Sequence, residues 1–273
     1  MKLNSKFYVP ALALILAASQ AAADDMDVDV IGPSTRSSVA IADNDYHYSA
    51  NQRSNQSGLI EGNVKQSINT LSVSGIWALD PQLNLTWSLP YALHNSTTSI
   101  WQATVQRSGQ TGLGGALGIS ATFYEASNAP QGFKLTAYAG LDNEKSENAL
   151  YFGMIQPQYK FSDQFTLASS LGQQHESNGL NDEFLNLNLI WHVSPALTLT
   201  PSANFVHYEA FDTYSSVNRI GLGLSATYHL DRTWSISAQA SYASLSDQVT
   251  HYYINDLTNT SAYNVKAGIR YRF

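Results

Sequence analysis

The chain ends with AYNVKAGIRYRF, residues 262–273, in which two kinds of side chain alternate without a break. One set is apolar or aromatic: Tyr263, Val265, Ala267, Ile269, Tyr271 and Phe273. The other set is polar, basic or small: Asn264, Lys266, Gly268, Arg270 and Arg272. Because successive side chains of a β-strand point to opposite faces, this pattern predicts a strand between an apolar and a polar environment.

The same alternation recurs earlier in the chain. In 218–229 (NRIGLGLSATYH) and in 83–91 (LNLTWSLPY), apolar residues take every second position. The polar face is mostly Ser, Thr, Gly and Asn, whereas the exposed face of a soluble sandwich would carry Lys and Glu. A narrow, wet interior facing an apolar exterior is the better interpretation, and it predicts a transmembrane barrel.

Composition supports an exported membrane protein. Residues 1–23 combine a basic start, an apolar run over 7–18 and small residues at 21–23, which is typical of a cleaved signal peptide. The chain has no Cys, 16 Tyr and only 13% charged residues. The net charge of -7 argues against a nucleic-acid partner. We expect 24–35 to be a polar periplasmic tail and 36–273 to be the barrel, located in the bacterial outer membrane.

Turn signals divide the barrel into strands. Short turns are predicted at 80–82, 127–130, 162–164, 194–196 and 231–233, and longer connections at 93–111, 143–148, 176–183, 209–217 and 246–261. The predicted strands are 67–79, 83–92, 112–125, 132–142, 148–160, 165–176, 183–193, 197–208, 218–229, 233–245 and 262–273. An even number requires another strand within 36–65. The fold class expected is therefore all-β, a twelve-stranded antiparallel transmembrane β-barrel with its short turns in the periplasm.

Seven aromatic residues lie near the short turns, where a girdle at the inner membrane interface is expected. They are Trp77, Trp87, Tyr159, Phe161, Trp191, Tyr228 and Trp234.

Two segments and the chain end resemble a known family. Leu89-Pro90-Tyr91, the glycine-rich stretch 112–118 and the final Tyr271-Arg272-Phe273 resemble the outer-membrane barrels described as MetA-pathway-of-phenol-degradation type. One departure is Gly115, where that family tends to have Asp. The resemblance spans about 70–273 and implies a channel for small molecules, hydrophobic or aromatic ones included.

A second, local resemblance concerns possible chemistry. His175, Ser177, Asn178 and Gly179 resemble the HxSNG motif of outer-membrane phospholipase A, which implies His175 as base and Ser177 as nucleophile. Alternation places both on the outward face at the external rim, where an acyl ester would lie.

A base of this kind needs a third group to orient its imidazole ring. The resemblance implies an outward Asn on the next strand, and Asn186 is the candidate. By alternation, however, Asn186 points inward unless a bulge occurs near 182–184. The alternative interpretation of the motif is a rim His and Ser beside an Asn-Gly turn, without chemistry. An Asn, Asp or Glu within hydrogen-bonding reach of His175 would favour the hydrolase.

The inward face offers a second candidate site. Arg219, His229, Lys266, Arg270 and Arg272 have inward parity, and Glu176 lies near the rim. These charges would either line a pore or form a salt-bridged plug.

The function expected is thus a channel or transporter for small molecules. The alternatives are an acyl hydrolase that uses Ser177 and His175, and a purely structural or interaction barrel. The expected partners are outer-membrane lipid, the barrel-assembly machinery and a small-molecule permeant. We expect no cofactor and no metal, except calcium if the protein is a hydrolase. Loop carboxylates at Asp142, Glu144, Glu147, Asp182 and Glu183 could bind a divalent cation, although such groups are usually solvated.

Overall fold

The computed structural model describes residues 36–54, 57–80, 82–100, 103–113, 115–125, 133–143, 150–176, 181–210, 215–247 and 256–273. The expected signal peptide and tail lie outside these ranges. Every strand pairing in this part of the chain is antiparallel. No helix here is long and apolar enough to cross a bilayer.

Thirteen strands form one sheet. They are β1 (Ser38–Arg53), β2 (Ile60–Ala78), β3 (Leu83–Ile100), β4 (Ala103–Leu113), β5 (Gly115–Glu125), β6 (Phe133–Asn143), β7 (Leu150–Lys160), β8 (Phe165–Glu176), β9 (Asn181–His192), β10 (Leu197–Tyr208), β11 (Val217–His229), β12 (Trp234–Leu245) and β13 (Asp256–Arg272). Their order is β2-β1-β13-β12-β11-β10-β9-β8-β7-β6-β5-β3-β4, and β2 also pairs with β3. That last pairing joins the sheet into a ring.

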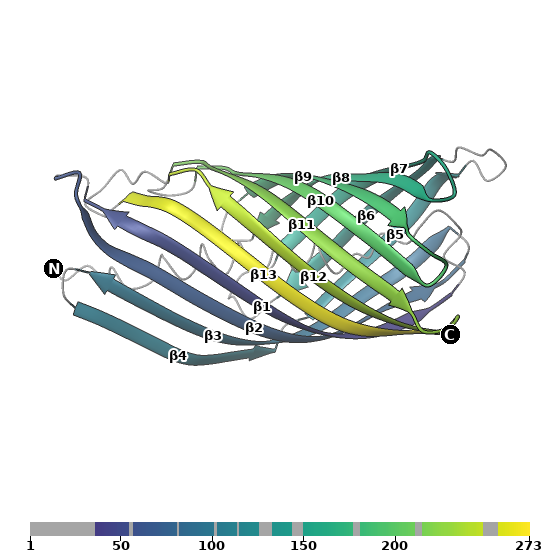
Figure 1. Cartoon of the computed structure of the whole chain (residues 1–273), viewed down its shortest axis with the longest axis horizontal. Helices are drawn as coiled ribbons and strands as arrows, with labels where there is room; N and C mark the ends of the chain where they lie inside the picture. Colours follow the sequence, from purple (N-terminus) through teal and green to yellow (C-terminus); the bar gives the residue numbers. More distant parts are fainter. Residues whose placement is uncertain are drawn as a thin grey trace.

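The ring has twelve positions, because β4 and β5 share one. Leu113 of β4 lies opposite Tyr91, and Ala116 of β5 lies opposite Ser88, so both strands run along β3 in the same register. The predicted twelve-stranded antiparallel barrel is confirmed. Figure 1 shows the strands inclined around a common axis, with the C-terminus at one end and the ends of the β1–β2 and β3–β4 hairpins at the other.

Strand boundaries were predicted wrongly at several places on the external side; β2, for example, begins at Ile60 rather than at 67. The segment 93–111, expected to be a connection, instead forms most of a hairpin, since β3 continues to Ile100 and β4 starts at Ala103. The connection predicted at 246–261 also overlaps β13, which begins at Asp256. In both places the strand leaves the membrane, so the apolar half of the alternation disappears although the backbone pairing continues.

The short turns share one hydrogen-bonding arrangement. The first residue accepts, on its side-chain oxygen, the backbone N–H groups two and three positions later. Asp80 accepts Gln82 and Leu83 at 2.7 and 2.8 Å, and Asp231 accepts Thr233 and Trp234 at the same distances. Ser162 and Ser194 use their hydroxyl oxygens in the same way. The turn predicted at 127–130 lies outside the described ranges.

Hydrogen bonds also affect the acidity of one turn residue. The hydroxyl of Thr233 and the N–H groups of Thr233 and Trp234 lower the pKa of the Asp231 carboxyl from its ordinary value. The charged form is favoured because all of these donors point at it.

The outward face is an apolar band between aromatic residues. On β12 it runs from Trp234 to Tyr242, and on β13 from Tyr271 to Tyr263. Trp234 and Tyr271 contact each other with ring centroids 4.8 Å apart, and Phe165 stacks on Trp191 at 5.9 Å. These pairs lie at the periplasmic ends of their strands. Of the predicted girdle, Trp77, Phe161, Trp191, Tyr228 and Trp234 are exposed.

Candidate functional site

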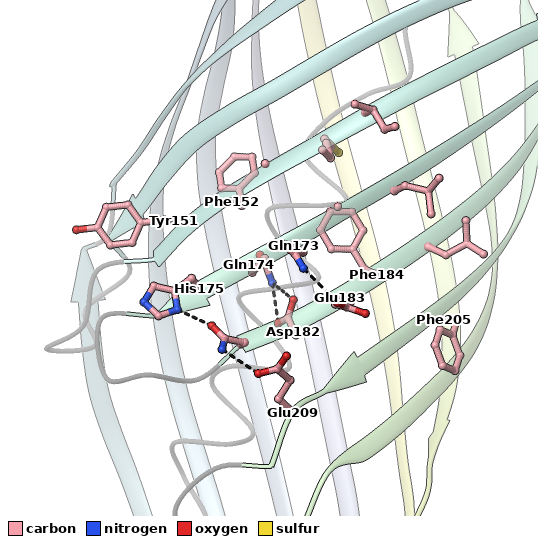
Figure 2. Close-up of a pocket in the computed structure, with 17 residues that line it drawn as sticks. Tyr151, Phe152, Gln173, Gln174, His175, Asp182, Glu183, Phe184, Phe205 and Glu209 are labelled. Carbon is pink, nitrogen blue, oxygen red and sulfur yellow. Dashed lines mark hydrogen bonds between the residues drawn. The ribbon is translucent and has the colours of Figure 1, made fainter.

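A groove crosses the outer face of β7, β8, β9 and β10 near the external rim (Figure 2). Its volume is about 930 Å³. Gly153 of β7 lies opposite Gln173 of β8 and has no side chain to fill the space between Tyr151 and Ile155. The apolar band of these strands ends inside the groove, so its walls are apolar towards the membrane and polar towards the exterior.

A chain of hydrogen bonds connects three side chains at the polar end. His175 on β8 and Asn181 on β9 are direct partners in the β8–β9 ladder. Nδ1 of His175 donates a hydrogen bond to Oδ1 of Asn181, with 2.5 Å between the two atoms. Nδ2 of Asn181 in turn donates to Oε2 of Glu209 at 2.9 Å. Because an amide oxygen only accepts, Nδ1 carries a ring proton, and in the neutral form of the ring Nε2 is then an acceptor.

The structure corrects one residue of the hydrolase hypothesis. The β8–β9 register is unbroken from Phe165 opposite Trp191 to His175 opposite Asn181, so no bulge turns Asn186 outward. Asn186 lies opposite Ser170 and Asn204 on the inward face and cannot reach His175. Asn181, which the sequence analysis treated as part of a connection, contacts the ring instead. Ser177, the expected nucleophile, lies outside the described residues.

The neighbouring carboxylates separate onto two faces. Glu183 points outward and accepts a hydrogen bond from Gln173 at 3.1 Å. Asp182 points inward, is buried, and accepts two bonds from Gln174 at 3.2 and 3.0 Å. They therefore cannot bind one cation together. The side chain of Asp142, together with Glu144 and Glu147, falls outside the described part. Within that part, no group of three or more His, Cys, Asp or Glu is placed to hold a metal ion.

A second outward His–Asn pair lies on the next hairpin and was not predicted. Nδ1 of His207 donates to Oδ1 of Asn218 at 2.7 Å, and the two residues are direct partners in the β10–β11 ladder. His207 does not line the groove. A search for His and Asn at ladder-opposite positions of a hairpin could have found both pairs.

The predicted pore-lining set faces inward where it is described. Arg219 is buried at 3% exposure, and its ladder partner Val206 also faces inward. His229, Lys266, Arg270 and Arg272 are half-buried on the same face of their strands. The side chain of Glu176 is outside the described part. Towards the periplasmic ends of β11 and β13, the inward face thus carries basic side chains.

The external half of the lumen contains a large apolar and aromatic cluster beside buried polar groups such as Arg219, Asp182 and Gln174, and the alternation of the sequence did not predict this cluster. We call this buried set of inward side chains the lumen cluster. It comprises Tyr46, Tyr48, Ala50, Val64, Ile68, Met154, Phe184, Val206, Tyr208, Val217, Leu245, Leu257 and Ala262. Tyr46 and Tyr208 are 1% and 2% exposed. The lumen cluster therefore lies near the exterior with Arg219 between two of its members, whereas Lys266, Arg270 and Arg272 lie nearer the periplasm.

A closed antiparallel barrel with an apolar outer band between aromatic residues defines an integral protein of the bacterial outer membrane. The chain belongs to the family described as MltA-interacting protein MipA, whose model matches residues 39–273. This confirms the expected location and class, but it confirms neither the MetA-pathway nor the phospholipase resemblance. No curated protein matches the chain.

Solved structures show the same fold at low sequence identity. The translocator domain of the autotransporter NalP from Neisseria meningitidis has a TM-score of 0.56 and 15% identity, with 97% of each chain covered. An outer membrane channel from Pseudomonas putida F1 has a TM-score of 0.56 and 10% identity, with 91% of this chain and 98% of that chain covered. The transport unit of the autotransporter AIDA-I from Escherichia coli has a TM-score of 0.52 and 12% identity, covering 91% and 93%.

Proposed function

We propose that this barrel is a channel for small organic anions that carry an apolar or aromatic part. The observation that carries the proposal is the presence in one lumen of the apolar and aromatic lumen cluster and, nearer the periplasm, of the basic residues Lys266, Arg270 and Arg272. A solute with an apolar part and a negative charge would contact apolar side chains near the exterior and basic side chains nearer the periplasm. Rings of basic side chains favour anions in narrow pores.

The experiment is conductance in planar bilayers with a salt gradient. Wild-type protein should conduct and its reversal potential should indicate anion preference. The double variant Lys266→Gln, Arg270→Gln should lose much of that preference while it still conducts. Gln239, inward and opposite Lys266, gives the matched neutral control Gln239→Asn. A barrel that folds but shows no conductance would refute the channel.

The family description favours a second candidate, an interaction role. It names a protein, MltA, with which members of the family interact. The corresponding role for this chain would be to hold a partner of that kind at the outer membrane. Co-purification of the barrel with an MltA-type protein from the same cells tests it, and an inert, unrelated barrel of similar size is the control. Equal recovery by both barrels would remove this candidate.

The contact between His175 and Asn181 favours a third candidate, the acyl hydrolase. It provides the oriented imidazole that the hypothesis requires, with Asn181 in place of Asn186. Ser177→Ala and Asn181→Leu should each abolish fatty-acid release from lipid vesicles, with calcium present, whereas Asn218→Leu should not. If the wild-type protein releases no fatty acid under these conditions, the barrel is not a hydrolase.

A further inference from the structure

The groove on β7–β10 lies where the membrane surface must pass. On β8 the outward residues change from Leu171 to Gln173 and His175, and on β9 from Leu185 to Glu183 and Asn181. The end of the apolar band marks the boundary between acyl chains and headgroups. The groove therefore extends from hydrocarbon into the headgroup layer of the outer leaflet.

The apolar end of the groove is open to contact by a lipid acyl chain, because other side chains of the described strands do not cover it. Tyr151, Ile155, Leu171 and Phe205 are 48%, 47%, 45% and 40% exposed, and all four line it. Gly153 lies between Tyr151 and Ile155 and adds no side chain to the floor of the groove. An acyl chain in this position would cover side chains that face lipid in any case.

The polar end is rich in hydrogen-bond acceptors. Glu183 and Glu209 are exposed carboxylates, and each already orients one amide, that of Gln173 and that of Asn181. In its neutral form His175 also offers Nε2 as an acceptor, since its Nδ1 donates to Asn181. A headgroup at this position must therefore supply donors, as a sugar does through its hydroxyls. A phosphate, which has acceptors and negative charge, would meet two carboxylates.

We infer that this groove binds a lipid with a saccharide headgroup, with its chain against the apolar end and its hydroxyls on Glu183, Glu209 and His175. The inference does not depend on a channel through the lumen, because the groove lies on the outer face. It also does not require catalysis, since no bond is made or broken.

The test compares two probes that share one chain, dodecyl maltoside and dodecyl phosphate. Each is added to the folded barrel in phosphatidylcholine nanodiscs, and retained ligand is counted by native mass spectrometry. Wild-type protein should retain the maltoside in preference to the phosphate. Asn181→Leu, which disconnects His175 from Glu209, should weaken maltoside retention about tenfold, consistent with the loss of one or two hydrogen bonds.

The neighbouring pair provides the matched control. Asn218→Leu breaks the same kind of His–Asn contact at the same rim but outside the groove, and it should leave retention unchanged. Equal retention of both probes by wild-type protein, or equal losses in the two variants, would overturn the inference. The hydrolase candidate is tested separately by fatty-acid release, so its failure is distinguishable from a failure of the site.

Discussion

Gly172 of β8 tests how tightly the inner face of β7, β8 and β9 is packed. A Cβ atom at this position would collide with Cζ of Phe184 and would lie 2.5 Å from the carbonyl oxygen of Gly153 and 2.7 Å from Cβ of Met154. Carbon atoms in ordinary contact are about 3.5–4.0 Å apart, so the neighbours would have to retreat by roughly 1 Å. Phe184 could rotate away, but the carbonyl oxygen belongs to the strand backbone and Cβ of Met154 is fixed to it.

Gly172→Ala should therefore destabilise the barrel. Overpacking costs about 1–3 kcal/mol, while replacing glycine lowers the entropy of the unfolded chain and returns about 0.4–1 kcal/mol. The expected net loss in the free energy of unfolding is about 1–2 kcal/mol, or roughly a tenfold change in the folding equilibrium. Urea unfolding in lipid vesicles, followed by tryptophan fluorescence, measures this difference.

Gly115→Ala is the matched control, since the nearest atom to its added Cβ would be Cδ2 of Leu89 at 3.9 Å. This variant should be as stable as wild type or slightly more stable. If the two variants unfold at the same urea concentration, the inner face is looser than the distances imply and the argument fails.

Three further predictions concern other parts of the barrel. Gly221→Ala should destabilise through collision with the Asn204 side chain, and Asn204→Ala should relieve most of the loss in the double variant, as a double-mutant cycle of thermal unfolding would show. The pKa of Asp231 is lowered in the folded state, so its contribution to stability is present above the unfolded value of about 3.9 and is lost as the pH falls through the folded value. Asp231→Asn keeps the acceptor without the charge, and its melting temperature should fall less than that of wild type between about pH 4 and pH 2. Trp234→Ala removes the contact with Tyr271 at the periplasmic interface and should lower stability by about 0.5–1.5 kcal/mol beyond the area effect, relative to Thr233→Ser as a control in urea unfolding.

The fold could be predicted because lipid imposes a strict alternation on the strands that cross it. The ranges 165–176 and 197–208 were predicted with the bounds that β8 and β10 have. The first strand could be placed only through the even-number rule. Its outward face carries Asp43, Asp45 and His47, polar residues in positions where other strands show apolar ones, so β1 lacks the signal on which the prediction depended.

The position of His175 could be predicted, but its partner could not. Alternation and turn direction gave its outward orientation at the external rim, and its side chain is exposed there. The partner depends on register, and register depends on where the connection ends. Taking β9 to begin at 183 excluded Asn181, whereas the strand begins two positions earlier. Similarly, the lumen cluster could not be predicted, because the alternation within one strand does not show which inward side chains meet across the barrel.

The pairing of β1 with β13 has a consequence for the order in which the barrel assembles. Most strands pair with their immediate neighbours in sequence, so hairpins can form locally and quickly as the chain becomes available. Ser38 and Arg272 are partners from opposite ends of the barrel, and their ladder continues to Arg53 and Asp256. This contact can form only after the last strand has been delivered, and loop closure over such a separation is slow. Until then both β1 and β12 present open edges, so the barrel cannot close before the segment from Asp256 onward is available.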